Sequence, residues 1–450
     1  MAGRLFGTNG VRGVINKDMN VQLAMDLGKA IGTFMGGRVA IGNDSRTSAA
    51  MIKSAVASGL MCAGAQALDL GLVPTPVVQH YVKNNGLAGG IMITASHNPP
   101  EFNGIKCIDS DGTEMPRSKE EEIERLYFTR TFRSMPWNAV GQMRQASGAV
   151  HDYLDSVKKL VDADAIRGAG LTVVLDCANG AGVVSTPMLL DDLNVRAITI
   201  NCNPQGTFPG HPSEPVESHL RDLIAMVKDT GADMGIAHDG DADRTIFVDD
   251  KGRYLYGDKS LAITAEAMVR ENGGGTVVTP VSSSMAVEDV VRRAGGDIIY
   301  TRVGSPVVAR KMIEVRALFG GEENGGLIFP KHQYCRDGAM TVAKMLEIVT
   351  RSGPLSKLVD SIPTYSQDKR KLICSDECKE SVLAALVEHY SSQRVDTTDG
   401  VKICYDDGWT LVRPSGTEPL FRIYSEARTG EDAKRRSEEC EKVLVDLLAR

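Results

Sequence analysis

Apolar and polar positions follow one another along the chain in a repeated order that is typical of α/β proteins. An apolar run that reads as a strand is followed by a polar or glycine-rich turn, a helical stretch and a second strand. The unit starts three times, at 38–44, 171–177 and 275–280. The helices are expected near 47–63, 185–193 and 285–294, and the closing strands at 65–70, 195–200 and 297–301. This repetition predicts three related α/β domains with mostly parallel sheets.

The C-terminal part of the chain has a different pattern. A helical stretch at 376–390 precedes an alternating segment, 401–412, which reads as a hairpin about the turn Asp407-Gly408. A strand at 421–425 and an amphipathic helix at 430–448 complete a smaller α+β domain. With joints near 135–150, near 251–257 and at Ile362-Pro363, the expected domains are 1–150, 151–255, 256–363 and 364–450.

Length and composition agree with a globular protein of several domains. The 450 residues exceed what one hydrophobic core usually supports, and 42% are hydrophobic and 24% charged. The net charge of −7 argues against a nucleic-acid partner. No apolar stretch is long enough to span a membrane and the N-terminus has no secretion signal, so we expect a cytoplasmic protein without a membrane partner. The nine dispersed cysteines are expected to be reduced thiols.

The segment 239–244, Asp-Gly-Asp-Ala-Asp-Arg, places three carboxylates at alternate positions between two apolar runs. Carboxylates about 4 Å apart repel each other by a few kcal/mol, so protonation or a bound cation must offset the repulsion. Hard oxygen ligands without a nearby cysteine favour magnesium or calcium. A polar turn is the alternative. A helix–loop–helix calcium loop is excluded because Arg244 and Asp250 occupy its sixth and twelfth positions.

A second polar loop begins at Ser96, after the apolar strand 89–95. Open α/β sheets present ligands at such strand ends, so Ser96 is a candidate nucleophile, with a turn or capping serine as the alternative. His97 is grouped with the catalytic candidates, although an adjacent residue is poorly placed to be the base of that serine. Lys106 is expected to return toward the same loop. Arg12 lies among glycines near the N-terminus, a setting that suits an anion.

Two further loops carry groups that suit a sugar phosphate. The loop 320–326 exposes carboxylate and amide oxygens that suit sugar hydroxyls, and the loop 413–419 offers an arginine, hydroxyls and a backbone amide that suit a phosphate. A simple turn remains the alternative for each. The candidate substrate-binding residues of these loops are Glu322, Asn324, Arg413, Ser415, Gly416 and Thr417, with Arg422 close by in sequence.

With these residues assembled, the chain resembles the α-D-phosphohexomutase family, which includes phosphoglucomutases, phosphomannomutases and phosphoglucosamine mutases. The resemblance covers nearly the whole chain and rests on four motifs in the order of the family, at 94–99, 239–244, 320–326 and 413–419. It implies four domains around one cleft and an isomerase that interconverts hexose 6-phosphate and hexose 1-phosphate. The segments 6–13 and 413–419 look most like the phosphoglucosamine mutase branch, with phosphomannomutase or phosphoglucomutase as the alternative.

The resemblance also implies a role for each matched residue. Ser96 would carry the transferable phosphoryl group, whose oxygen would complete a magnesium site formed by Asp239, Asp241 and Asp243. Arg12 and Lys106 would assist proton transfer and steady the phosphoryl group, and Arg244 would face the substrate. A hexose bisphosphate would form as an intermediate and act as activator. The expected partner is a small hexose phosphate, and a homodimer is an open alternative to a monomer.

Two departures from the family pattern leave the preferred sugar open. Asn324-Gly-Gly326 stands where many relatives have Ser-Gly-His, and Ser305 stands where some have a histidine after Val303-Gly304. A magnesium-dependent sugar phosphatase, in which water accepts the phosphoryl group from Ser96, is the alternative of another class.

Overall fold

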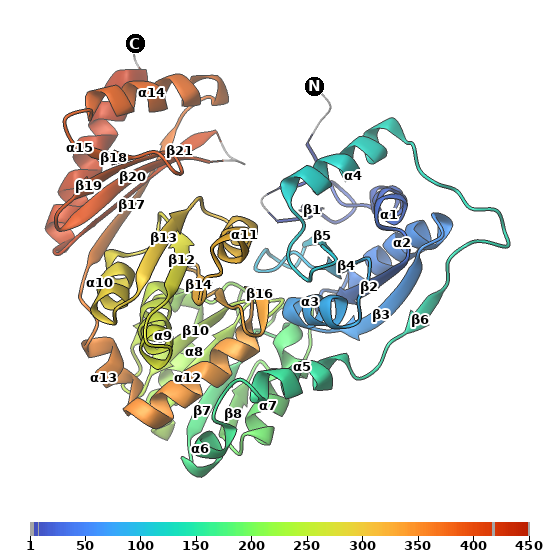
Figure 1. Ribbon diagram of the computed structural model, residues 1–450, viewed down its shortest axis with the longest axis horizontal. Helices are drawn as coiled ribbons and strands as arrows, with labels where there is room; N and C mark the ends of the chain where they lie inside the picture. Colours follow the sequence, from blue (N-terminus) through green and yellow to red (C-terminus); the bar gives the residue numbers. More distant parts are fainter. Residues whose placement is uncertain (1–3, 8, 416–418, 449–450) are drawn as a thin grey trace. The chain divides into compact units, whose positions relative to one another are not determined.

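The computed structural model describes residues 4–7, 9–415 and 419–448 (Figure 1). The chain forms two compact units, Met1–Ser260 with Asn324–Val359, and Leu261–Glu323 with Asp360–Arg450. The chain therefore leaves the first unit within the third expected domain, 256–363, returns to the first unit at Asn324 and ends in the second unit. Among the described residues, no helix is both long and apolar enough to cross a membrane.

The first unit begins with a six-stranded mixed sheet in the order β1-β5-β4-β2-β3-β6. The central strand β2 is parallel to β3 and β4, whereas β5 is antiparallel to β1 and β4. Helices α1 and α2 lie side by side, and α3 packs against β2 and β4 (Figure 1). The strands are Val11–Val14, Arg38–Asn43, Gln66–Leu72, Gly89–Ile93, Phe102–Ile108 and Met143–Gln145. The helices are Val21–Met35, Ala49–Cys62, Thr75–Asn84 and Arg117–Thr129 (α1 to α4).

A second mixed sheet follows the helices α5 (Ala149–Lys158) and α6 (Ala163–Gly168). Its order is β11-β10-β9-β7-β8, with β7 parallel to β8 and β9, and β10 antiparallel to β9 and β11. The strands are Thr172–Asp176, Arg196–Ile200, Met234–His238, Thr245–Asp249 and Tyr254–Leu255 (β7 to β11). The helical segments are η1 (Ala181–Val184), α7 (Thr186–Asp192), η2 (Glu217–His219) and α8 (Arg221–Thr230). Every residue of β9 and β10 is buried, which fixes a rigid frame on both sides of the loop 239–244.

The third expected domain, 256–363, contributes strands to both units. In the second unit, β12 (Thr276–Pro280) is parallel to β13 (Asp297–Thr301) and to β14 (Phe319–Gly321). In the first unit, β15 (Leu327–Phe329) and β16 (Gln333–Arg336) form an antiparallel pair. The helices of this region are α9 (Gly257–Glu271), α10 (Met285–Arg293), α11 (Ser305–Val315), α12 (Gly338–Ser352) and α13 (Leu355–Asp360).

The predicted repetition is confirmed by the register of the strands. The first two strands of each predicted unit pair in parallel, as β2 with β3, β7 with β8, and β12 with β13. Parallel neighbours need a crossover between them, and the helices α2, α7 and α10 supply it. The sheets are mixed because the strands that leave the ligand loops, β5 and β10, turn back antiparallel to the strands that enter them.

The C-terminal sheet is antiparallel throughout, in the order β17-β21-β20-β19-β18, and α15 packs against β17 and β21. The predicted hairpin is present, but its turn is Asp406-Asp407, because Gly408 already pairs with Tyr405 at the start of β20. The strands are Ser366–Ile373, Arg394–Asp396, Val401–Tyr405, Gly408–Pro414 and Leu420–Ala427 (β17 to β21). The helical segments are η3 (Asp376–Cys378), α14 (Lys379–His389) and α15 (Gly430–Leu448).

Helices α1 and α2 can pack closely because position 59 is a glycine. This close contact leads to a prediction about stability. A Cβ atom at Gly59 would lie 2.2 Å from the Met25 carbonyl oxygen and 2.6 Å from the Lys29 nitrogen. Gly59→Ala should therefore lower the free energy of unfolding by about 1–3 kcal/mol, measured from the midpoint of urea denaturation. Gly168→Ala is the matched control, because a Cβ there meets nothing within 4 Å. Equal shifts in the two variants would contradict the prediction.

Candidate active and metal-binding site

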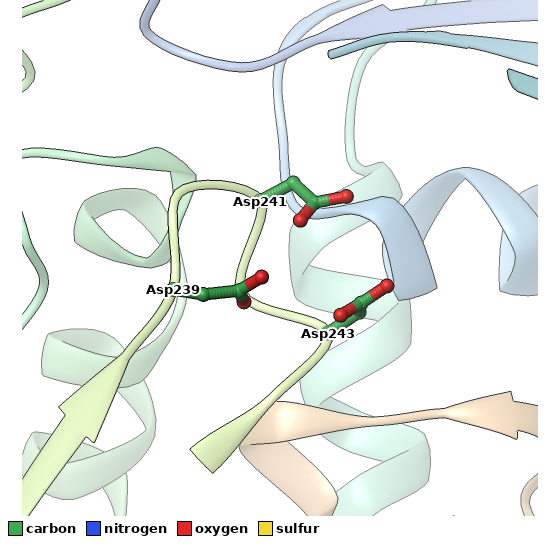
Figure 2. A group of neighbouring side chains, drawn as sticks. All are labelled: Asp239, Asp241 and Asp243. Atoms are coloured by element: carbon green, nitrogen blue, oxygen red, sulfur yellow. The ribbon is translucent and has the colours of Figure 1, made fainter. Parts of the chain in front are cut away.

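Three buried carboxylates converge on the loop that joins β9 to β10. Asp239, Asp241 and Asp243 each offer an oxygen, and these atoms lie within 4.8 Å of one another (Figure 2). The loop is short because His238 pairs directly with Thr245 across the two strands. All three carboxylates have almost no exposed surface, so their mutual repulsion is weakly screened.

The charges around this cluster shift the ionisation of its members in opposite directions. Burial, together with the charges of Asp241 and Asp243, raises the pKa of Asp239 to about 8. Burial acts in the same sense on Asp241, but Lys106, with Thr75 and Arg336, outweighs burial and holds the pKa of that carboxyl below its usual range. The Lys106 Nζ lies 2.6 Å from Asp241 Oδ2 and 3.4 Å from Asp243 Oδ2. The cluster thus contains one carboxyl that cannot ionise easily without further positive charge.

The cluster fits a divalent cation. Two of its oxygens, Asp241 Oδ1 and Asp243 Oδ1, are buried and accept no hydrogen bond from the described residues. A buried carboxylate oxygen without a donor carries a desolvation penalty that a bound cation removes. The donor set consists of carboxylate oxygens, which magnesium and calcium prefer. Among the described residues, this group consists of aspartates alone, without the His or Cys ligands that softer metals favour.

Ser96 lies against this cluster in a strained backbone conformation. Its φ of 51° is in the left-handed region, which non-glycine residues rarely adopt. The side chain is fully buried, and Ser96 Oγ donates a 2.8 Å hydrogen bond to Asp239 Oδ2. The predicted proximity of serine and carboxylates is therefore present, although 143 positions separate the two residues in sequence. Backbone strain that the surrounding structure holds in place is frequent at functional sites.

His97 and Arg12 also lie beside the serine. His97 Nδ1 is 3.4 Å from Ser96 Oγ, and burial, assisted by Arg244 and Arg12, lowers the pKa of His97 to about 3. The imidazole is therefore neutral near pH 7. Arg12 Nη1 donates to Asn98 Oδ1 at 2.8 Å and to the Ala95 carbonyl at 3.2 Å, so it contacts the serine loop from β1. Burial is the main cause that lowers the pKa of Arg12.

Lys106 and Arg244 bring positive charge to the carboxylates from two directions. Lys106 belongs to β5, whose antiparallel pairing puts it opposite Met92 of β4, the strand that leads to Ser96. The return of this lysine toward the serine loop thus occurs as predicted from the sequence. Arg244 Nε lies 3.9 Å from Asp239 Oδ2 and 3.8 Å from Asp243 Oδ1.

Three residues of this site were not predicted from the sequence. Arg336 Nη2 on β16 binds Asp243 Oδ2 at 2.6 Å, and the Thr75 hydroxyl at the start of α3 donates to Asp241 Oδ2 at 2.5 Å. Neither residue stands in a recognisable motif. The third, Arg46, follows the C-terminal end of β2, and the position of Asp44-Ser-Arg46 at a parallel strand end was a signal that could have revealed it.

Arg46 holds the backbone of the serine loop. Its guanidinium donates to the carbonyl oxygens of Ser96 at 2.8 Å, Asn98 at 2.6 Å, Pro99 at 2.6 Å and Phe102 at 2.9 Å. Its Nε also pairs with Asp44 Oδ2 at 3.1 Å. A planar group with five donors is suited to such a set of converging carbonyls, and lysine is not.

The remaining candidates lie outside this cluster. In the first unit, Asn324 Oδ1 accepts from Gly326 N at 3.1 Å, and the adjacent Gly325 carbonyl accepts from Thr245 N at 3.0 Å. In the second unit, Glu322 is buried and its Oε1 accepts from Gly304 N at 3.2 Å. Arg413 and Arg422 are paired across β20 and β21.

The phosphate loop is described only in part. The Ser415 nitrogen donates to the Leu420 carbonyl at 2.9 Å, and Lys379 Nζ donates to the Ser415 carbonyl at 2.8 Å. The predicted residues Gly416 and Thr417 lie outside the described residues.

Comparison with known proteins agrees with this fold and site. Family profiles for phosphoglucomutase/phosphomannomutase α/β/α domains I, II and III match residues 3–134, 151–252 and 256–365, and the C-terminal domain profile matches 371–443. A phosphoglucomutase/phosphomannomutase of Thermococcus kodakarensis is 42% identical, with 99% of each chain covered. A phosphoglucosamine/phosphogalactosamine mutase of Sulfurisphaera tokodaii is 39% identical, with 98% of this chain and 99% of its own covered.

A solved structure matches nearly the whole length of the chain. The crystal structure of a phosphoglucomutase/phosphomannomutase family protein from Burkholderia thailandensis matches with a TM-score of 0.86 and 27% identity, with 97% of each chain covered. The chain described here belongs to the phosphoglucomutase/phosphomannomutase family. The resemblance noted in the sequence is thereby confirmed, and with it an enzyme of the phosphohexomutase class, an isomerase that transfers phosphoryl groups.

Cation binding at the carboxylate cluster generates a prediction that needs no activity assay. Magnesium added to the EDTA-treated protein should stabilise the fold by about 2.7 kcal/mol at a concentration 100 times its Kd, seen as a higher thermal midpoint. Asp243→Asn should remove most of this shift because it withdraws one carboxylate from the group. Asp229→Asn, on the exposed face of α8, is the control and should keep the shift. Equal shifts in both variants would exclude the cation site.

The contacts of Arg46 predict that it positions the serine rather than merely stabilising the fold. Arg46→Lys should lower kcat for phosphohexomutase turnover about 100-fold, because a displacement of the reacting group by about 1 Å has an effect of this size. KM should change less than about threefold, because none of the bonds donated by Arg46 involves a predicted substrate loop. Arg38→Lys is the control, since the hydrogen bond that its guanidinium donates to the Asn85 carbonyl is exposed to solvent. A wild-type kcat in Arg46→Lys would refute the role.

Proposed function

We propose that this enzyme interconverts hexose 6-phosphate and hexose 1-phosphate by way of a phosphorylated Ser96, with glucosamine 6-phosphate to glucosamine 1-phosphate as its preferred reaction. The observation that carries the proposal is the fully buried Ser96 Oγ, 2.8 Å from Asp239 Oδ2 in a cluster of three carboxylates. Lys106 and Arg12, within the same unit, add the positive charge that phosphoryl oxygens require.

The proposed reaction consists of two phosphoryl transfers that leave the enzyme unchanged. In the first, the bond between phosphorus and Ser96 Oγ breaks while a bond forms to the free hydroxyl oxygen of the hexose monophosphate, which gives a hexose bisphosphate. After the bisphosphate has reversed its orientation, its other phosphoryl group passes to Ser96 Oγ. The proton that the sugar hydroxyl loses in the first transfer returns to the sugar oxygen that is released in the second.

Each part of the chemistry has candidate residues in this chain. Asp239, Asp241 and Asp243 would hold magnesium, which offsets the charge on phosphoryl oxygens when it is bound. Lys106 and Arg12 would neutralise the phosphoryl group and, with His97, form the set from which the proton carrier comes.

Substrate recognition is assigned to the loops that follow the other sheets. Glu322 and Asn324 would accept hydrogen bonds from sugar hydroxyls, and Arg244 would face the substrate from the carboxylate loop. The phosphate that does not react would be held by Arg413, Ser415, Gly416, Thr417 and Arg422.

The choice of glucosamine rests on similarity. The segments 6–13 and 413–419 resemble the phosphoglucosamine mutase branch, and the names of relatives with 39–41% identity include phosphoglucosamine mutase. Glucose or mannose phosphates are the alternative substrates, in keeping with the name of the Thermococcus kodakarensis relative.

Phosphorus NMR with magnesium and a trace of the matching hexose bisphosphate tests the proposal. Glucosamine 6-phosphate should be converted to the 1-phosphate faster than mannose or glucose phosphates are interconverted. Ser96→Ala should lower the rate about 1,000-fold or more, as expected for the loss of a covalent nucleophile. Ser58→Ala, an exposed serine on α2, is the control and should retain full activity.

Two outcomes would contradict the proposal in different ways. Release of inorganic phosphate at the turnover rate, without interconversion, would identify a sugar phosphatase instead. Faster interconversion of mannose or glucose phosphates would keep the mutase and change only the preferred sugar.

A further inference from the structure

A single carboxylate of the second unit joins the proposed phosphate loop to the neighbourhood of the proposed sugar loop. Asp399 Oδ2 accepts two hydrogen bonds, from Arg413 Nε at 2.6 Å and from the Val303 nitrogen at 2.9 Å. Asp399 and Arg413 are 15% and 24% exposed, so water weakens this ion pair only in part. No sequence motif drew attention to this aspartate.

The residue after Val303 extends the contact of Asp399 to Glu322 of the proposed sugar loop. Gly304 follows Val303 and donates its N–H to Glu322 Oε1 at 3.2 Å. Arg302, on the other side, donates from Nε to the Thr398 carbonyl at 3.1 Å. The segment 302–304 is therefore bound to the proposed sugar-reading carboxylate at one end and to the segment 398–399 at the other.

The position of Asp399 follows from the hairpin of the C-terminal sheet. Val401 pairs with Val412, so the residues just before β19 run alongside the end of β20, where Arg413 lies. Gly400 makes this close approach possible, because a Cβ there would lie 2.2 Å from the Val412 carbonyl oxygen and its φ is 80°. The backbone thus delivers Asp399 to the guanidinium of Arg413.

A carboxylate beside a phosphate site repels the phosphate, so its presence at this position needs a compensating interaction. Arg413 pairs with Arg422 across the sheet, and Arg422 pairs with Lys371 on the next strand, so three cationic residues lie in one row. Like charges opposite one another destabilise a sheet, and Asp399 offsets part of this repulsion. By binding Nε, it also fixes the plane of the Arg413 guanidinium, whose Nη groups are donors suited to phosphate oxygens.

We infer that Asp399 is a positioning residue that orients Arg413 toward the phosphate of the substrate and sets its distance from the sugar loop. The inference rests on the proposed function, because it takes Arg413 as a ligand of the substrate phosphate. Asp399 acts on binding through Arg413 and has no part in the transfer of the phosphoryl group.

A double-mutant cycle tests this role with the full-length enzyme. Asp399→Asn should raise KM for the hexose phosphate about 10-fold while kcat changes less than about threefold, since a charge-assisted hydrogen bond is lost at the binding arginine. In an Arg413→Ala background the same change should have no further effect on KM, because its target is gone.

The matched control is another aspartate–arginine pair, which joins the β19–β20 turn to α15. Asp407 Oδ1 lies 2.6 Å from Arg436 Nη2 and stands in the turn at the opposite end of the β19–β20 hairpin. Asp407→Asn should leave both KM and kcat unchanged. Asp399→Glu keeps the charge but moves it by one methylene group, and it should give a KM between those of the wild type and Asp399→Asn.

The outcomes separate this inference from the proposed function. If the unmodified protein interconverts no hexose phosphate, the proposed function fails. If it is active but Asp399→Asn has an unchanged KM, or raises KM equally with and without Arg413, the positioning role is wrong. Should Asp399→Asn fail to fold, Asp399→Glu decides: a raised KM with an unchanged kcat supports the role, and an unchanged KM overturns it.

Discussion

The repulsion among three buried carboxylates is the constraint on which the first unit depends. Asp239, Asp241 and Asp243 lie within 4.8 Å of one another with almost no access to water. Cations from separate parts of the unit approach them, Lys106 from β5 and Arg336 from β16. Removing one partner of such buried charges leaves an uncompensated charge. The first sheet and the β15–β16 pair must therefore pack beside the carboxylate loop of the second sheet in the one position that keeps Lys106 and Arg336 paired with its aspartates.

The strained serine loop follows from the same arrangement. Ser96 adopts a left-handed conformation at an expense of about 1–3 kcal/mol, and the surrounding structure must hold it there. Arg46 does so from the end of a neighbouring strand, with bonds to four carbonyl oxygens around the loop. Because Arg46 already orders the serine loop, little conformational entropy of the loop remains to be lost when a reaction takes place there. Such an ordered loop suits phosphoryl transfer, which depends on positioning and charge neutralisation more than on a strong nucleophile.

Much of the fold was predictable because its signals are local. Alternation and apolar runs depend on neighbouring residues, so the three strand–helix–strand repeats, the strands that flank 239–244 and the helix 430–448 appear as expected. The return of Lys106 was predictable for the same reason, since only the serine loop, residues 94–101, separates β4 from its antiparallel neighbour β5. The hairpin turn was misplaced by one residue because pairing across strands, and not turn composition, decides where Gly408 begins its strand.

By itself, the sequence determined which side chains are candidates for the chemistry, since the serine, the aspartates and the basic residues stand in motifs at strand ends. Only the tertiary structure decided which groups support them. Arg46, Thr75 and Arg336 bind the serine and carboxylate loops from positions up to 166 residues away. Of the three, only Arg46 stands at a strand end that the sequence marks, and no local pattern marks Thr75 or Arg336. The neutrality of His97 and the raised pKa of Asp239 are likewise properties of burial and of neighbouring charges. The periodicity of apolar residues indicates which face of a helix or strand is buried. The pKa values and hydrogen-bond partners of the side chains on that face depend on which residues pack against it, and only the tertiary structure gives those.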